Sequence, residues 1–417
     1  MGRLRAVRKR WRTGLGTAVL CALVTAVPAQ AAFNRAPIQL GAGDGGSPTV
    51  VMDPAGTAHV VWGIADELIG YCALPRGARR CSRTAQLALD ARAGRPHILR
   101  RPQDGLLIVI AGRNDVDADP HESTWAFTSS DGATWSGPAP IGLGIGDALD
   151  SAALTADGQA VDLLQSVTGA NLFQRAPLAG PPSAAVLNLA TSPAGTSTDY
   201  TYPGELLRLR NGRTLALLGS PADGFAYRLL SGADPFADAS WQPWPAKIVD
   251  REWDEPRGAT GPRGSYVMYG VHIVDQVYGG APQVVRRLRG TRWRRPRGLF
   301  YEVTANTSNA SLAQDGKGRL HAAIVGYADS GRRSCIAYAR TSSKRRWFSR
   351  AVSVQQTIKD ADEAGMVRLA VDDTGRGVVA WSTLRTPSAA RVQWVAPGRG
   401  ITRPRPHANR GCPPFPR

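Results

Sequence analysis

The densest group of metal-binding side chains in the sequence is an acidic loop at residues 114–122, which reads Asn-Asp-Val-Asp-Ala-Asp-Pro-His-Glu. Carboxylates at every second position can converge on one hard cation, and calcium prefers such oxygen ligands. Pro120 stands where a standard calcium-binding loop requires glycine, so the spacing matches only the opening of such a loop. We therefore expect calcium as the candidate cofactor, held by Asp115, Asp117, Asp119 and Glu122.

Two other acidic runs, at residues 250–255 and 359–363, are rival cation sites of the same kind. Acidic pairs also suit glycoside hydrolysis, in which two carboxylates face one sugar across a set gap. The sequence offers many carboxylates and no way to choose a pair, so the catalytic residues stay open. The residues that we expect at a ligand-binding rim are Tyr202, Glu205, Arg208, Asp250, Glu252, Asp254 and Glu255.

Other catalytic signatures are missing from the sequence. It contains no Gly-x-Ser-x-Gly elbow, no His-Glu-x-x-His pair and no phosphate-binding glycine loop. His59 and His321 occupy equivalent places in two copies of a repeat described below, which favours a shared packing role over catalysis. An enzyme is therefore the second choice, and a binding module is the first.

The N-terminus predicts export. A basic stretch is followed by an apolar run and by Ala29-Gln30-Ala31, the pattern of a signal peptide over residues 1–31. No later apolar segment is long enough to span a bilayer, so we expect a secreted, monomeric protein. The whole chain carries a formal charge of +18, and a basic exported protein can bind an anionic cell-surface polymer or an acidic glycan.

Four of the five cysteines lie beyond the leader, as expected for disulfides in an oxidising compartment. Cys72 and Cys81 flank a turn between two expected strands, which would bring them together. Cys335 and Cys412 remain for each other. Both bridges are expected to be structural.

A glycine turn between two apolar stretches recurs along the chain at intervals of roughly 50 residues, a spacing typical of propeller blades. Each unit contains two further strand-like segments, which gives four antiparallel strands per blade. The fold class that we predict is therefore an all-β, seven-bladed β-propeller, with six blades as the alternative. The turns end at Gly56, Gly105, Gly158, Gly212, Gly264, Gly318 and Gly375.

The last unit lacks its fourth strand, because residues 399–417 form a Pro- and Arg-rich tail. Residues 34–41 look like a fourth strand, yet they precede the first complete unit. We expect this N-terminal strand to complete the last blade and close the ring, which removes exposed sheet edges. The propeller domain then covers residues 32–398.

One turn carries a recognisable motif. The stretch Ser-Ser-Asp-Gly-Ala-Thr-Trp at residues 129–135 resembles the Asp-box of the sialidase-like (BNR repeat) propeller family, although it is one residue shorter. The resemblance implies a structural turn between the third and fourth strands and a carbohydrate-related function for the fold. An Arg-Ile-Pro motif, which carries one of the substrate arginines of sialidases, is absent. The residues that match the box are Ser129, Asp131, Gly132, Thr134 and Trp135.

Charges are expected to divide between the two faces of the ring. Most acidic residues fall in connections on the face where propellers usually bind ligands, which disfavours an anionic sugar there and permits a metal or a neutral glycan. The opposite face carries a basic patch, which fits an anionic polymer; nucleic acid is the less favoured partner. The patch consists of Arg286, Arg287, Arg289, Arg292, Arg294, Arg295, Arg297, Lys344, Arg345 and Arg346.

We therefore predict an exported binding or scaffold propeller, with a glycan, a metal ion or an anionic polymer as ligand. The alternative is a sialidase-like glycoside hydrolase whose active site has diverged.

Overall fold

The computed structural model describes the strands of the chain and their short turns. The described residues are 37–42, 48–65, 67–89, 95–112, 123–143, 148–167, 170–189, 202–220, 224–230, 241–243, 256–270, 283–289, 292–293, 297–298, 304–328, 333–341, 352–356, 364–383 and 389–395. Every regular element among them is a β-strand. No helix of the described residues is long and apolar enough to cross a bilayer.

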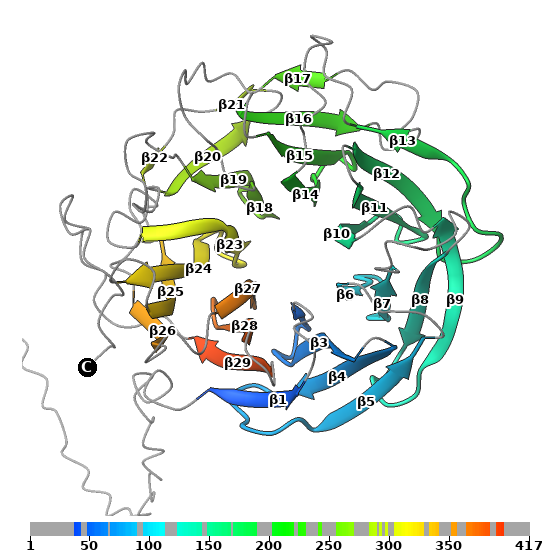
Figure 1. Ribbon diagram of the computed structural model, residues 1–417, viewed down its shortest axis with the longest axis horizontal. Coiled ribbons are helices and arrows are strands. Elements are labelled where there is room, and N and C mark those ends of the chain that lie inside the picture. The colour runs from blue at the N-terminus through cyan, green and yellow to red at the C-terminus, as the bar shows by residue number, and fades with distance from the viewer. Residues whose placement is uncertain are drawn as a thin grey trace, which may run out of the picture.

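The strands pair into seven antiparallel sheets, which stand as blades around a central axis (Figure 1). We number the blades in chain order, beginning with the sheet of β2 to β5. Blades 1 to 3 consist of β2 (Thr49–Met52), β3 (Ala58–Ala65), β4 (Leu68–Leu74), β5 (Arg83–Ala88), β6 (His97–Arg100), β7 (Leu107–Ala111), β8 (Ser123–Ser129), β9 (Ser136–Leu143), β10 (Ala148–Leu154), β11 (Ala160–Val167), β12 (Ala170–Pro177) and β13 (Val186–Asn188).

Blades 4 to 7 repeat this order of strands. They consist of β14 (Tyr202–Arg208), β15 (Thr214–Ser220), β16 (Gly224–Leu230), β17 (Trp241–Pro243), β18 (Arg257–Gly261), β19 (Gly264–Gly270), β20 (Gln283–Arg289), β21 (Arg292–Trp293), β22 (Arg297–Gly298), β23 (Thr304–Gln314), β24 (Leu320–Ala328), β25 (Arg333–Arg340), β26 (Val352–Gln356), β27 (Ala364–Val371), β28 (Gly377–Thr383) and β29 (Ala389–Val395). The predicted seven-bladed, all-β fold is confirmed.

The first strand of each blade lies nearest the axis (Figure 1). These seven inner strands are β2, β6, β10, β14, β18, β23 and β27, and each contacts the inner strand of the next blade around the whole ring. The connections between strands lie on the two opposite faces of the ring. We call the face with the connections between blades, and from second to third strands, the mouth face. The opposite face, with the connections from first to second and from third to fourth strands, is the turn face.

The predicted glycine turns join the first and second strands of all seven blades. Each of the seven glycines has a positive φ, between 68° and 105°, which glycine adopts readily because it lacks a Cβ. At the first residue of the turn the backbone N–H bonds across the hairpin, as from Asp53 to Thr57 at 3.0 Å and from Asp372 to Arg376 at 2.8 Å. The repeat seen in the sequence is thus a repeat of hairpin geometry.

The hydrophobic core lies between blades. Each cluster of buried side chains combines second-strand residues of one blade with those of its neighbour, for example Val109 of blade 2 with Val61 of blade 1. The second strands are consequently buried on both faces, and Val60, Val61, Ile108 and Ile110 have no exposed surface. Burial on both faces explains their nearly continuous apolar sequence.

The N-terminal strand closes the ring, as predicted. β1 (Ile38–Ala42) pairs antiparallel with β29 and supplies the fourth strand of blade 7. Its Ile38 and Leu40 pack on a cluster that also contains Val392 of blade 7 and Trp62 of blade 1. Blades 1 and 7 are thereby joined through strand pairing and through a common core.

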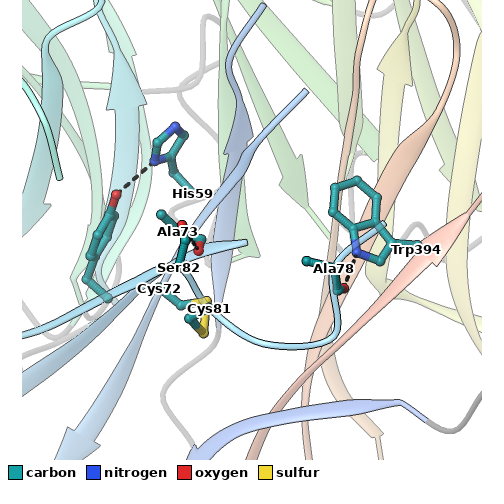
Figure 2. Close-up of a disulfide and its surroundings, with 8 residues drawn as sticks. His59, Cys72, Ala73, Ala78, Cys81, Ser82 and Trp394 are labelled. Atoms are coloured by element: carbon teal, nitrogen blue, oxygen red, sulfur yellow. Dashed lines mark hydrogen bonds between the residues drawn. A yellow bond between two sulfur atoms is a disulfide. The ribbon is translucent and has the colours of Figure 1, made fainter. Parts of the chain in front are cut away.

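A disulfide-tied loop adds a second connection at this seam (Figure 2). The predicted bridge between Cys72 and Cys81 is present, and it closes the connection from β4 to β5. Within that loop the carbonyl of Ala78 accepts a hydrogen bond from the indole of Trp394 in blade 7, at 3.0 Å. Cys335 lies in β25, but the expected bridge to Cys412 falls outside the described residues.

Candidate functional site

The inner strands share one register position relative to the glycine turns. It lies four residues before the first residue of each glycine turn, so it falls at the same height in every blade. The seven residues at this ring position are Thr49, His97, Ser151, Glu205, Arg257, Ser311 and Arg368.

Most ring positions hold neighbouring blades together. Thr49 Oγ1 accepts a hydrogen bond from the backbone N–H of Ile98 at 3.0 Å. Ser151 and Ser311 accept in the same way from Leu206 and Leu369, both at 3.0 Å. The Glu205 carboxylate accepts from the N–H of Gly258. A small or acidic acceptor at this position therefore joins the inner strands of neighbouring blades by a hydrogen bond.

His97 also bonds to the next blade, but through its ring. Its Nε2 lies 3.0 Å from the carbonyl oxygen of Leu149, and because a carbonyl only accepts, Nε2 carries the proton. The pKa of His97 is lowered to about 3, mainly because burial disfavours the charged ring. The guanidinium groups of Arg368, Arg95 and Arg257 lower it further. His97 is thus neutral at physiological pH.

The two arginines of the ring position differ from the other five residues because each presents a fixed positive charge. Arg257 is 3% exposed, which is rare for a cation. Arg257 belongs to blade 5 and Arg368 to blade 7, yet both act on His97 in blade 2. Arg257 and Arg368 share the register position of His97 on the inner strands of their blades.

An acidic residue accompanies these cations on the mouth side. Asp150 lies at a bulge of β10, where the register shifts between Leu149 and Ser151. It is 3% exposed, and its Oδ1 lies 3.6 Å from a guanidinium nitrogen of Arg95. Bulges often re-aim a side chain beside a functional site. Inner strands of blades 4, 6 and 7 carry register shifts toward the same end.

The candidate site consists of the charged residues and the histidine at or beside the ring position. They are three arginines, two carboxylates and a neutral imidazole, namely Arg95, Arg257, Arg368, Asp150, Glu205 and His97. Arginine presents a planar fork that fits carboxylate and phosphate oxygens, whereas carboxylates and imidazole accept bonds from hydroxyl groups. The arrangement suits a small ligand that carries both hydroxyls and one acidic group.

The predicted rim residues separate in the structure. Tyr202 begins β14 at the mouth end, and Glu205 occupies the ring position. Arg208 ends β14 at the turn face, so it does not line the mouth with them. Sequence proximity placed these residues together, but a strand that runs the depth of the blade carries its ends to opposite faces. The other expected rim residues, Asp250, Glu252, Asp254 and Glu255, lie outside the described residues.

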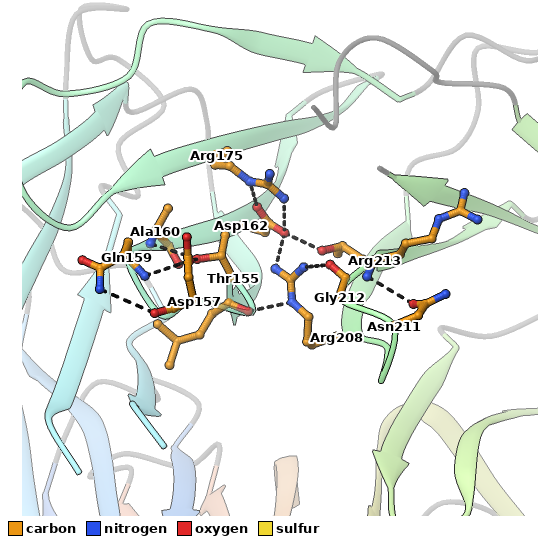
Figure 3. A network of polar contacts seen from close by, with 12 residues as sticks. Thr155, Asp157, Gln159, Ala160, Asp162, Arg175, Arg208, Asn211, Gly212 and Arg213 are labelled. Atoms are coloured by element: carbon orange, nitrogen blue, oxygen red, sulfur yellow. Dashed lines mark hydrogen bonds and ion pairs between the residues drawn. The ribbon is translucent and has the colours of Figure 1, made fainter. Parts of the chain in front are cut away.

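Arg208 instead joins a buried network between blades 3 and 4 (Figure 3). It donates to Asp162 at 2.7 Å, to the carbonyl of Leu154 at 2.8 Å and to that of Gly212 at 2.7 Å. Asp162 has no exposed surface and also accepts from Arg175, at 2.7 Å, and from the hydroxyl of Thr214. The role of Arg208 in this structure is to connect two blades.

The turn at residues 129–135 is held together by its own hydrogen bonds. It joins β8 and β9, and Asp131 Oδ1 accepts from the N–H groups of Ala133 and Thr134 at 2.8 and 2.9 Å. These bonds lower the pKa of Asp131, led by the bond from Thr134. Trp135 packs edge-on against Tyr71 of blade 1, with 4.9 Å between ring centroids. The turn thus anchors blade 2 to blade 1 on the turn face, away from the mouth.

His59 and His321 have the shared packing role that their equivalent positions predicted. Nδ1 of each lies within hydrogen-bond distance of a tyrosine hydroxyl, 2.8 Å from Tyr71 and 2.6 Å from Tyr338. His321 Nε2 donates to the turn carboxylate of Asp315 at 3.2 Å. Burial is the main reason that the pKa of each histidine is lowered. These clusters stabilise two blades from within.

Several predicted groups fall outside the described residues. These are the cation ligands Asp115, Asp117, Asp119 and Glu122, and the basic residues Arg294, Arg295, Lys344, Arg345 and Arg346. Arg286, Arg287, Arg289, Arg292 and Arg297 lie on β20 to β22. The side chain of Arg287 is exposed. Among the described residues, no group of histidine, cysteine or carboxylate side chains is placed to hold a metal ion.

Comparison with known proteins supports the fold. No family model matches the sequence, and no curated protein does. A hydrazine synthase chain from Kuenenia stuttgartiensis has a similar structure, with a TM-score of 0.53 at 10% identity, over 85% of this chain and 97% of the other. This likeness is one of fold alone.

Two weaker structural matches carry no argument about function. A protein of unknown function from Dyadobacter fermentans gives a TM-score of 0.49 at 13% identity, over 72% of this chain and 94% of the other. The sialidase of Trypanosoma rangeli gives 0.39 at 10% identity, over 85% of this chain and 55% of the other. The similarity to sialidase-like propellers thus stays at the level of the β-propeller architecture.

Proposed function

We propose that this protein is an exported binding module whose ligand enters at the mouth face and contacts Arg95, Arg257 and Arg368 on the axis. The ligand class that fits is a glycan, or a similar polyhydroxyl molecule, that bears one acidic group. The observation that carries this proposal is that Arg257 and Arg368, on the inner strands of blades 5 and 7, share the register position of the buried His97, and that Arg95 lies two residues before His97 in blade 2. An acidic group on the ligand would be attracted by these positive charges.

This ligand differs from the neutral glycan or metal that the acidic rim led us to expect. Most acidic residues assigned to that rim lie outside the described residues, with Glu67 and Asp150 as the described members. Nearer the axis the fixed charges of the described residues favour an anion.

A glycan array with neutral, uronic-acid and sulfated glycans tests the proposal. Arg368→Gln should weaken binding of the best acidic glycan by about 10- to 100-fold, because a charge-assisted hydrogen bond contributes about 1.5–3 kcal/mol. The matched control is Arg210→Gln, since Arg210 is an exposed arginine on the turn face. Equal loss in both variants, or binding of neutral glycans alone, would overturn the proposal.

The alternative function is a sialidase-like glycoside hydrolase with a diverged site. Asp150 and Glu205 come from the contacting inner strands β10 and β14, and a hydrolase uses two carboxylates that face one sugar. Glu205, however, holds the backbone of Gly258, as a structural fastener would. A panel of chromogenic glycosides separates the two functions, because turnover that Asp150→Asn abolishes would establish the hydrolase and refute a pure binding role.

A further inference from the structure

The turn face carries a line of cations that runs from blade 5 into blade 6. The guanidinium of Arg287 donates to the carbonyl of Arg263, the residue at the tip of the blade 5 hairpin. The Arg263 side chain lies across the next hairpin, because a Cβ built on Gly318 would fall 2.4 Å from its Cγ. Lys317 is exposed at the tip of that hairpin.

The same arrangement continues through blade 7 to blade 1. Arg319 of blade 6 donates to the carbonyl of Thr374 in the blade 7 hairpin at 2.9 Å. Arg376 is exposed on that hairpin. Arg76, in the disulfide-tied loop of blade 1, reaches back to Asp372 of blade 7 at 2.8 Å. We call this continuous set the basic rail: Arg287, Arg263, Lys317, Arg319, Arg376 and Arg76.

Most carboxylates along the rail are turned inward. Asp315 and Asp372 are 1% and 6% exposed, and their Oδ1 atoms accept hydrogen bonds from the N–H groups of their own turns. Burial alone would raise the pKa of Asp315, but bonds from His321 and Arg319 bring it to about 2. Asp373 is the exposed acid on the blade 7 hairpin. The Oδ2 atoms of the two buried acids pair with Arg319 and Arg76, so the cations that the rail presents at its surface are led by Arg263, Lys317 and Arg376.

The turn face of blades 2 and 3 differs. There the exposed acids are Asp104, Asp131 and Asp157, and Arg101 is already paired with Asp104. The described turn face of blades 2 and 3 therefore differs from the rail in the sign of its exposed charges. The rail crosses several neighbouring hairpins, so an extended ligand can contact its cations one after another.

We propose that the basic rail binds a flexible linear polymer with a phosphate in every repeat. Successive cations on neighbouring hairpins can contact successive anionic groups, and each contact releases a condensed counterion. The rail is rich in arginine, whose forked guanidinium matches phosphate oxygens better than a lysine ammonium does. This site lies on the face opposite to the proposed glycan site and is independent of it.

A polymer without bases fits better than a single-stranded nucleic acid. Proteins that bind single strands stack the bases on exposed aromatic rings. Among the described residues, the large hydrophobic side chain classed as exposed is Val186 of β13, away from the rail. Tyr266, which lies 5.7 Å from the guanidinium of Arg287, is itself 8% exposed.

Fluorescence anisotropy with end-labelled linear inorganic polyphosphate tests the proposal over a salt series. The triple variant Arg263→Gln/Lys317→Gln/Arg376→Gln removes exposed charges and leaves Arg319 and Arg76 in their contacts. It should weaken binding at least tenfold and reduce the slope of log K against log salt by about 2, since each cation contributes about 0.7 with a single-stranded polyanion. Asp373→Asn should strengthen binding, because it removes the exposed acid on the rail.

The matched control is Arg100→Gln/Arg101→Gln on blade 2, which should leave polyphosphate binding unchanged. All variants should keep wild-type circular dichroism and wild-type glycan binding, so failure of the rail would be distinguishable from failure of the mouth site. An unchanged salt slope in the triple variant, or an equal loss in the control, would overturn the proposal. So would tighter binding to an oligo-dT strand or to phosphatidylglycerol vesicles than to polyphosphate.

Discussion

The buried network at Asp162 gives a prediction whose size can be worked from the structure. Asp162→Asn preserves the shape of the side chain but leaves Arg175 and Arg208, whose side chains are 16% and 20% exposed, beside a neutral amide. Removing one partner of a fully buried ion pair costs about 3–5 kcal/mol. Because Arg208 keeps two carbonyl acceptors and both arginines reach some solvent, we expect a loss of about 2–4 kcal/mol in the free energy of unfolding. Urea denaturation followed by tryptophan fluorescence measures it.

Asp104→Asn is the matched control for this prediction. Asp104 also pairs with an arginine through a short contact, but its pair with Arg101 is exposed, and exposed pairs contribute little to stability. The urea midpoint of this variant should stay within error of the wild type. In a second test, Asp162→Asn/Arg175→Met should regain part of the lost stability, since it removes one uncompensated cation. Equal midpoints for Asp162→Asn and Asp104→Asn would refute the reasoning.

Three further predictions concern the rest of the ring. The pKa of His97 is about 3 in the folded chain and about 6.5 in an unfolded one, so the free energy of unfolding should fall as pH drops through this window. This group contributes at most about 1.4 kcal/mol per pH unit to that fall. In urea titrations at several pH values, His97→Asn should make the free energy of unfolding less dependent on pH between about 6.5 and about 3. Cys72→Ala/Cys81→Ala should lower the free energy of unfolding by about 2–4 kcal/mol. It should also speed hydrogen exchange in β1 and β29, as measured by mass spectrometry. Unchanged exchange would show that the disulfide-tied loop does not support the junction of blades 1 and 7. Gly70→Ala should lower the free energy of unfolding, measured with urea, by about 1–3 kcal/mol, because its Cβ would fall 2.4 Å from the Trp62 indole. The control is Gly77→Ala, which has open space around it but a φ of 71°. It should show only the smaller cost of backbone strain.

The sequence predicted the features that depend on local backbone chemistry. A glycine that must adopt positive φ recurs in every blade, so the hairpins and their count could be found without coordinates. The closing strand could be found as well. The last repeat of the sequence has only three strands, and the N-terminal segment offers one extra strand that can serve as the fourth. The Cys72–Cys81 bridge followed from two cysteines that flank a hairpin.

The candidate site could not be predicted in the same way. Its ring position is occupied by side chains as different as Thr49, Glu205 and Arg368, so no residue type recurs in the alignment. Only the register shows that these residues lie at one height, four positions before each turn. An alignment of the repeats that includes the four residues before each turn distinguishes Arg257 and Arg368 as cations among small acceptors. Arg208 shows the converse, because nearness in sequence to Glu205 says nothing about which face a side chain reaches.

A crystal structure of the protein with the best acidic glycan from the array tests the central claim most directly. The account predicts density for the glycan at the mouth face near the inner strands, with its acidic group within hydrogen-bond distance of the guanidinium of Arg368 or Arg95. A glycan bound on the outer strands or on the turn face, with the axis left to solvent, would contradict it.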